Sequence, residues 1–252
     1  AKLCPPLMMT GNRIIGPQAR QKILASSEFD PACITRYPFK PFDVRWCYLD
    51  NIRPLFSEPS PELLQHRSIQ GNRFFITRDT ADKAPEGPPF LFSRLICDYD
   101  CISGHARHFP IYALGNPKKN GVLKGLFAQE EEEPYTLANL SRQTRLYLHE
   151  LEVANPDNQT QLAELPWLHA LAIGYSPAYL SENADGITQD WPRIPLPDSL
   201  AALQASAQLG RRIAALLDTE ADLPGVTPTS AVCSLTPLFF TYFHRLPFEK
   251  PP

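Results

Sequence analysis

The sequence predicts an α+β fold, with a β-rich portion over residues 1–129 and a mainly helical portion over residues 130–252. Up to about Gly125, short aromatic and β-branched runs alternate with Pro, Gly, Asn and Asp, a pattern typical of strands joined by turns. Farther along the chain, apolar residues recur at the spacing of helices that bury one face. Four glutamates closed by Pro134 indicate a solvated loop at the boundary. The two portions form either two units or one compact domain.

The first half is expected to contain one early helix, near residues 18–24, and several short strands. The predicted strands cover residues 74–77, 90–92, 95–97 and 109–114. Each run is short and rich in aromatic or β-branched side chains, which pack well on a pleated surface.

The second half is expected to contain several helices. Ser141 and Ser176 supply the side-chain oxygen that caps a helix start, and Pro177 follows the second cap at a position where proline is favoured. The predicted helices cover residues 139–151, 162–173, 176–180 and 198–217. Pro166 is tolerated in the second of them only within the first turn. The core face of the longest is expected to include Leu200, Leu203, Ala207, Ile213, Leu216 and Leu217.

The composition is that of an ordinary globular protein, with 43% hydrophobic and 20% charged residues. No apolar run approaches the roughly 18 residues that a membrane span needs, and we expect a cytoplasmic protein. The six cysteines are spread thinly and are expected to be reduced thiols. Because the chain begins at Ala1 rather than Met and ends on Pro252, we expect a fragment of a longer polypeptide.

Charge is distributed unevenly along the chain, although the net charge is only −3. Residues 1–125 hold 17 basic and 11 acidic residues, whereas residues 126–252 hold 7 basic and 16 acidic residues. A basic binding face joined to an acidic remainder produces this asymmetry, and basic faces are typical of nucleic-acid-binding proteins.

Two strings are unusual. Residues 37–48, YPFKPFDVRWCY, alternate so that Asp43 and Arg45 lie on one side of a strand, within reach of a bidentate ion pair. We expect a core-forming strand in preference to direct DNA contact, because polar groups in aromatic surroundings are usually paired. Residues 190–197, DWPRIPLP, contain Trp191 and Arg193 and too many prolines for a helix. They predict a rigid extended strap between helices.

Together these strings resemble the C-terminal specificity domain of type ISP restriction–modification enzymes and of related adenine-specific DNA methyltransferases. Further segments match in the same order: NRFFITRD (residues 72–79), HFPIYAL (108–114), NLS (139–141) and SPAYL (176–180). The resemblance covers about residues 29–217. One departure is Lys40, where the family commonly has arginine; the charge is kept but the forked hydrogen bonding is lost.

The resemblance implies sequence-specific recognition of double-stranded DNA and places catalysis elsewhere. The chain has no glycine-rich cofactor loop, catalytic Asn-Pro-Pro-Tyr-like tetrapeptide or phosphate-binding loop. S-adenosylmethionine would therefore belong to the methyltransferase domain of the same or a partner chain. We expect DNA contacts from loops and strand ends. The candidate residues are Arg73, Arg78, Arg94, Arg107, Asn116, Lys118, Lys119 and Lys124.

Two alternatives remain open. The scaffold could hold protein partners in a defence complex, which differs from DNA binding in its weak salt dependence. The second alternative is a stand-alone zinc protein, because cysteine and histidine are common zinc ligands and four of them lie close together: Cys97, Cys101, His105 and His108. The loop between the two cysteines and the two histidines is, however, shorter than in most structural zinc sites. A hydrolase based on Asp100, Ser103 and His105 is less favoured, since no nucleophile-elbow motif is present.

Overall fold

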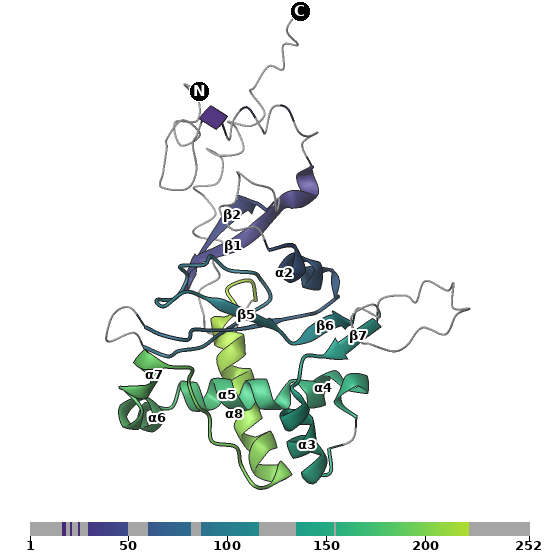
Figure 1. The fold of residues 1–252 in the computed structure, drawn as a ribbon, viewed down its shortest axis with the longest axis vertical. Helices are drawn as coiled ribbons and strands as arrows, with labels where there is room; N and C mark the ends of the chain where they lie inside the picture. Colours follow the sequence, from purple (N-terminus) through teal and green to yellow (C-terminus); the bar gives the residue numbers. More distant parts are fainter. Residues whose placement is uncertain are drawn as a thin grey trace, which may run out of the picture. The chain divides into compact units, whose positions relative to one another are not determined.

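The computed structural model describes residues 17, 18, 21, 25, 30–49, 60–81, 87–115, 135–153 and 155–221. The chain divides into two compact units, one of residues 1–33, 50–59 and 219–252 and the other of residues 34–49 and 60–218. Apart from the short 3₁₀ turn η2 (Pro31–Cys33), the elements below belong to the second unit. Its strands precede its main helices, which confirms the predicted α+β class (Figure 1).

A three-stranded antiparallel sheet lies at the centre of this unit. Strand β3 (Phe74–Thr77) pairs with β4 (Leu91–Ser93) on one side and with β5 (Arg107–Pro110) on the other. All four residues of β3 are buried, because both faces of the strand are covered. The FFIT sequence is therefore continuously apolar rather than alternating, as expected for a strand without a solvent face.

Two further antiparallel pairs flank this sheet. Strand β1 (Ile34–Lys40) pairs with β2 (Asp43–Tyr48), and β6 (Tyr112–Gly115) pairs with β7 (Tyr135–Ala138). The run predicted as one strand over residues 109–114 is two strands, β5 and β6, interrupted at Ile111. Residues 95–97 form no strand, and the early helix predicted near residues 18–24 falls mostly outside the described residues.

The helices begin where serine caps predict them. Ser141, Ser176 and Ser199 each accept a hydrogen bond from the backbone N–H three residues later. The elements are α2 (Pro61–Gln65), η3 (His66–Ser68), α3 (Arg142–Glu150), η4 (Pro156–Asn158), α4 (Thr160–Ala163), α5 (Leu165–Gly174), α6 (Pro177–Glu182), α7 (Gly186–Gln189) and α8 (Leu200–Leu217).

Two helix predictions need correction. The helix expected over residues 162–173 is divided at Glu164 into α4 and α5, so that Pro166 occupies the first turn of α5, where its missing N–H costs nothing. Leu216 was expected on the core face of α8, yet it is 63% exposed. The described helices include none long and apolar enough to cross a bilayer.

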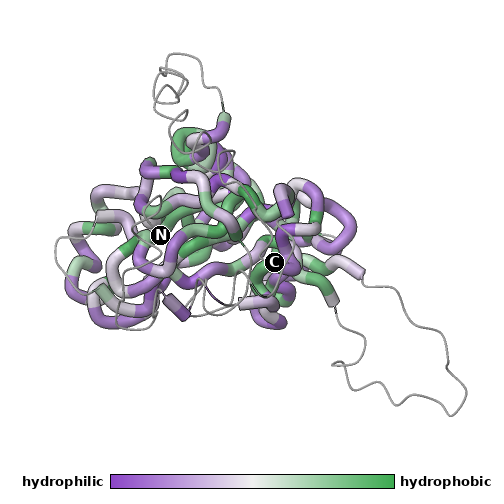
Figure 2. Tube along the Cα trace, turned by 90° about the horizontal axis from the view of Figure 1, so that it is seen from above, coloured by the Kyte–Doolittle hydropathy of each residue, from purple (hydrophilic) through white to green (hydrophobic). Residues whose placement is uncertain are grey.

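Hydrophobic side chains cover both faces of the central sheet, and Figure 2 shows the apolar stretches running through the interior of the trace. Phe75 points toward the helices and packs in one cluster with Leu168 of α5 and Leu203 of α8. Phe74 and Ile76 point the other way, into a second cluster with Cys97 and other residues of the loop after β4. Strand alternation divides the FFIT run between these two cores.

Residues 190–197 form the predicted extended strap between α7 and α8. Proline has no N–H to donate, so the strap is held by hydrogen bonds to its backbone carbonyls. The accepting carbonyls belong to alternate residues, because alternate residues of an extended chain face the same side. The three hydrogen bonds run from Tyr179 Oη to Arg193 O (3.1 Å), from His169 Nε2 to Pro195 O (2.8 Å) and from Tyr147 Oη to Pro197 O (2.7 Å). Because a carbonyl only accepts, Nε2 of His169 carries the hydrogen.

Candidate nucleic-acid interface

The string YPFKPFDVRWCY forms a β-hairpin, not the single core-forming strand that we expected. Its two strands turn at Pro41 and Phe42, and three of its aromatic side chains are exposed: Phe42 by 67%, Trp46 by 54% and Phe39 by 37%. Asp43 and Arg45 lie on one side as the alternation predicts, but Trp46 on the other side is exposed as well, because the turn folds the string back on itself. A two-stranded ribbon cannot bury every ring without a second layer on each side.

Cationic side chains lie over these rings. The guanidinium carbon of Arg36 is 5.2 Å from the ring centre of its cross-strand partner Trp46, and that of Arg45 is 4.1 Å from the centre of Phe39. Lys40 Nζ lies 5.7 Å from the same Phe39 ring. Stacking of this kind holds long cationic side chains in place while their charges remain at the surface. We call these three cations with Phe39, Phe42 and Trp46 the hairpin surface.

The predicted ion pair between Asp43 and Arg45 is present at the surface. Arg45 Nη2 is 2.6 Å from Asp43 Oδ2, and Arg45 Nε donates to both carboxylate oxygens at 3.0 and 3.2 Å. These hydrogen bonds lower the pKa of Asp43. Asp43 offsets one of the three cationic charges, which leaves the hairpin with a net charge of +2.

The hairpin is fixed to the body of the unit near its turn. Asp98 N donates to Pro38 O at 2.8 Å, and Tyr37 Oη donates to Asp98 Oδ2 at 3.3 Å. Burial and the nearby carboxylate raise the pKa of Tyr37, so its hydroxyl stays a donor at neutral pH. Lys40 Nζ also donates to Asp100 O. The turn end of the hairpin is therefore held in a fixed position against the loop that contains Asp98 and Asp100.

The loop that anchors the hairpin carries a second aromatic–cationic stack. The His105 ring lies parallel to that of Tyr99 at 4.2 Å, and the guanidinium of Arg107 is 5.7 Å from the Tyr99 ring centre. His105 Nδ1 is 3.1 Å from Asp100 Oδ1, and Arg107 Nη2 is 3.3 Å from Asp79 Oδ2. Arg107, a predicted DNA-contacting residue, thus lies at the start of β5, directly after the loop that adjoins the hairpin.

The other predicted arginines are not gathered with it. Arg78 is only 1% exposed and donates to Gly87 O at 3.4 Å, so its guanidinium faces the interior rather than a DNA surface. Arg94 forms an ion pair with Asp218 at 2.5 Å, and Arg73 lies 5.7 Å from the Phe92 ring centre. Asn116, Lys118, Lys119 and Lys124 lie outside the described residues.

The structure does not assemble the four predicted zinc ligands. Cys97 Sγ lies 3.1 Å from His108 Nε2, but His105 is turned onto Tyr99 and bonded to Asp100. Within the described ranges, no group of three or more His, Cys, Asp or Glu is placed to hold a metal ion. The four described cysteines, Cys33, Cys47, Cys97 and Cys101, carry free thiols. Burial lowers the pKa of His108 to about 4, which keeps this ring neutral.

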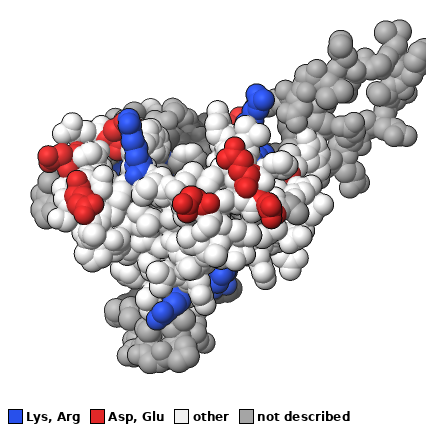
Figure 3. Space-filling model, turned by 90° about the horizontal axis from the view of Figure 1, so that it is seen from below, with Lys and Arg blue, Asp and Glu red and all other residues white. Residues whose placement is uncertain are grey.

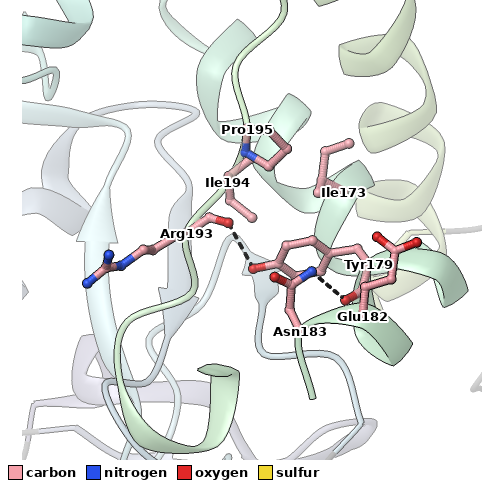
Figure 4. A pocket seen from close by; sticks show the side chains of 7 residues that line it. All are labelled: Ile173, Tyr179, Glu182, Asn183, Arg193, Ile194 and Pro195. Atoms are coloured by element: carbon pink, nitrogen blue, oxygen red, sulfur yellow. Dashed lines mark hydrogen bonds between the residues drawn. The ribbon is translucent and has the colours of Figure 1, made fainter. Parts of the chain in front are cut away.

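The strap borders a small pocket, shown in Figure 4. The ring of Tyr179 crosses it toward the Arg193 carbonyl, and Ile173 and Ile194 form its apolar wall. The Arg193 side chain is directed away from this wall and pairs with Asp190 at 3.1 Å. Trp191 is 42% exposed and meets Phe109 edge-on, with ring centres 6.0 Å apart. Trp191 therefore attaches the strap to β5, whereas the Arg193 side chain pairs within the strap.

Among the described residues, the face seen from below carries no patch of one charge. Figure 3 shows its acidic and basic side chains scattered among uncharged ones. Figure 1 shows the β1–β2 hairpin at the opposite end of the second unit from α3.

Comparisons with known proteins agree with this fold. With the type ISP restriction–modification enzyme LlaBIII bound to DNA, the TM-score is 0.56 at 12% identity, over 88% of this chain and 13% of that one. With the DrdV–DNA complex the TM-score is 0.53 at 18% identity, over 82% of this chain and 18% of that one. The chain thus spans less than a fifth of either neighbour.

No curated protein matches the sequence closely enough to supply a relative. A family model, however, aligns with residues 12–231, which is most of the chain. Its description is "Type ISP C-terminal specificity domain". The chain therefore belongs to the family of type ISP C-terminal specificity domains.

Proposed function

We propose that this chain recognises a specific sequence in double-stranded DNA, as the target-recognition module of a restriction–modification enzyme. Membership of the specificity-domain family over residues 12–231 carries this proposal. Both structural neighbours described above are bound to DNA, which supports the same assignment. The hairpin also places cationic side chains over exposed aromatic rings, and exposed cations are what a phosphate-binding surface needs.

In this proposal the chain selects the site and a methyltransferase domain performs the chemistry. That domain would bind S-adenosylmethionine and receive a target adenine flipped out of the duplex. Such an enzyme acts on DNA in the cytoplasm. The helical end would dock against the methyltransferase domain, and two exposed leucines of α8, Leu209 and Leu216, support this role. They are 55% and 63% exposed and, seven residues apart, lie on the same side of the helix.

The dependence of DNA affinity on salt tests this function. Each phosphate contact replaces condensed counterions, so the logarithm of the binding constant should fall linearly with the logarithm of salt concentration, with a slope of about −0.9 per contact. We expect fluorescence anisotropy of a labelled random-sequence duplex to show this slope. If no duplex binds at low salt, even with the methyltransferase domain supplied, the proposal is wrong. Binding to protein partners alone would favour the scaffold alternative.

A further inference from the structure

We propose that the β1–β2 hairpin enters the major groove of the DNA duplex, with Arg36 and Lys40 on phosphates and the Phe42 ring against base edges. This inference rests on the proposed function and assigns it to an element outside the predicted set of DNA-contacting residues. The hairpin is held in a fixed position by its contacts with Asp98 and Asp100, and it carries a net charge of +2 and three exposed rings.

The dimensions of the hairpin select the groove. Two paired strands lie about 4.8 Å apart, and their side chains bring the ribbon to roughly 10 Å across. The major groove of B-DNA is about 12 Å wide and admits such a ribbon, whereas the minor groove is about 6 Å wide and does not. Bases present their distinguishing edges in the major groove, so an element placed there contributes to sequence choice.

Phe42 at the tip is the strongest sign of a binding role. Its φ of 66° lies in the left-handed region, which costs a residue with a Cβ about 1–2 kcal/mol compared with glycine. The ring is also 67% exposed, so it gains little from burial within this chain. A turn selected for stability alone would have glycine or asparagine at this position. Thymine methyl groups offer an apolar surface for such a ring in the major groove.

Two cations of the hairpin are available for phosphates. Arg36 is stacked on Trp46, which holds its guanidinium at the hairpin surface. Lys40 is the last residue of β1 before the turn and is exposed; its bond to Asp100 O uses one of its three N–H donors and leaves two for a phosphate. Arg45 shares its charge with Asp43, so Arg36 and Lys40 are expected to provide most of the charge-dependent binding. Arg107, at the start of β5 beside the adjoining loop, would extend the same cationic surface.

Matched charge variants test the phosphate contacts. In the Arg36→Gln/Lys40→Gln double variant, the salt slope should become shallower by about 1.8, which corresponds to a loss of about 60-fold in affinity at 0.1 M salt, with convergence toward the parent chain near 1 M. The control is Arg142→Gln/Arg211→Gln, which removes the same charge from exposed positions on α3 and α8. We expect the control to bind DNA with an unchanged slope.

Phe42→Gly separates binding from stability. The substitution relieves the positive φ, so its Tm should equal or exceed that of the parent chain, while affinity for a preferred duplex should fall about fivefold or more. Unchanged affinity and slope in both hairpin variants, with a parent chain that binds DNA, would refute the hairpin role and leave the proposed function standing. Loss of methyltransferase-domain binding with DNA affinity intact would also refute it. Failure of the parent chain itself to bind DNA would count against the proposed function instead.

Discussion

At Gly210, helix α8 crosses α5 so closely that there is no room for a side chain between the two backbones. A Cβ added at this position would lie 1.8 Å from Leu168 O, 2.6 Å from its carbonyl carbon and 3.0 Å from its Cα. Normal contact begins near 3.4 Å, so Gly210→Ala requires the two helix backbones to separate by about 1.5 Å. Overpacking a core costs about 1–3 kcal/mol, and backbone atoms place this site at the upper end. Alanine returns up to about 1 kcal/mol of helix propensity. We expect a net loss of about 2 kcal/mol.

Gly186→Ala is the matched control for this substitution. Gly186 is also helical, at the start of α7, and an added Cβ there meets nothing within 4 Å. Urea unfolding followed by circular dichroism should give a lower midpoint for Gly210→Ala, and its Tm should fall by about 4–8 °C. Gly186→Ala should match or slightly exceed the parent chain. If Gly210→Ala were as stable as Gly186→Ala, the close contact between Gly210 of α8 and the Leu168 backbone of α5 would be incorrect.

Three further predictions concern charge, protonation and the strap. Arg145 bonds both carboxylate oxygens of Asp157 at 2.8 Å and donates to Ala138 O at 2.6 Å, so Asp157→Asn should lower the free energy of unfolding by about 1.5–3 kcal/mol at pH 7. These bonds lower the pKa of Asp157. The stabilisation that the carboxylate provides is therefore present above its unfolded pKa near 3.9 and is lost as pH falls through its folded pKa. The free energy of unfolding of the variant should depend less on pH in this acid range. Burial lowers the pKa of His108 to about 4, so the unfolded chain gains a proton near pH 6.5 while the folded chain does not. Stability should therefore fall by about 3 kcal/mol between pH 6.5 and 4, and His108→Gln should lack this component in a urea titration. Tyr147→Phe and Tyr179→Phe each remove one hydrogen bond to the strap and should each cost about 1 kcal/mol; no change in either urea midpoint would contradict the strap's attachment.

Local sequence signals predicted much of the helical half. Ser141 and Ser176 cap the helices that they were expected to cap, and Pro166 lies in a first turn, because these choices depend on a few neighbouring backbone groups. Leu216 was misplaced because helical spacing assigns a face without showing how far the partner surface extends. Burial at the end of α8 depends on packing against distant segments, which periodicity does not contain.

The hairpin shows a different limit of sequence reasoning. Period-two alternation through Asp43 and Arg45 correctly placed these residues on one side of a strand and in one ion pair. The turn at Pro41 and Phe42 was missed because its second residue adopts a left-handed conformation that favours glycine, and phenylalanine gives no turn signal. The basic and aromatic composition of the string was the available indication of an exposed binding element.

Position along the chain was a poor guide to the predicted DNA-contacting arginines. Arg78 directly follows the fully buried β3 and is itself buried, and Arg94 pairs with Asp218, which lies 124 residues away in the sequence. Arg107 alone among the described candidates adjoins the hairpin surface. A strand end can face solvent or the interior, and the sequence of the strand does not distinguish the two outcomes.

Selection of bound sequences from a randomised duplex pool tests the central claim most directly. The chain, within its full-length protein, should enrich one short sequence over many rounds, because a specificity domain must prefer one site over nonspecific DNA by roughly a thousandfold or more. Enrichment of a single motif would agree with sequence-specific DNA recognition. Loss of that enrichment in the Phe42→Gly and Arg36→Gln/Lys40→Gln variants would agree with the proposed role of the hairpin. A pool that binds well but remains random after selection would contradict it.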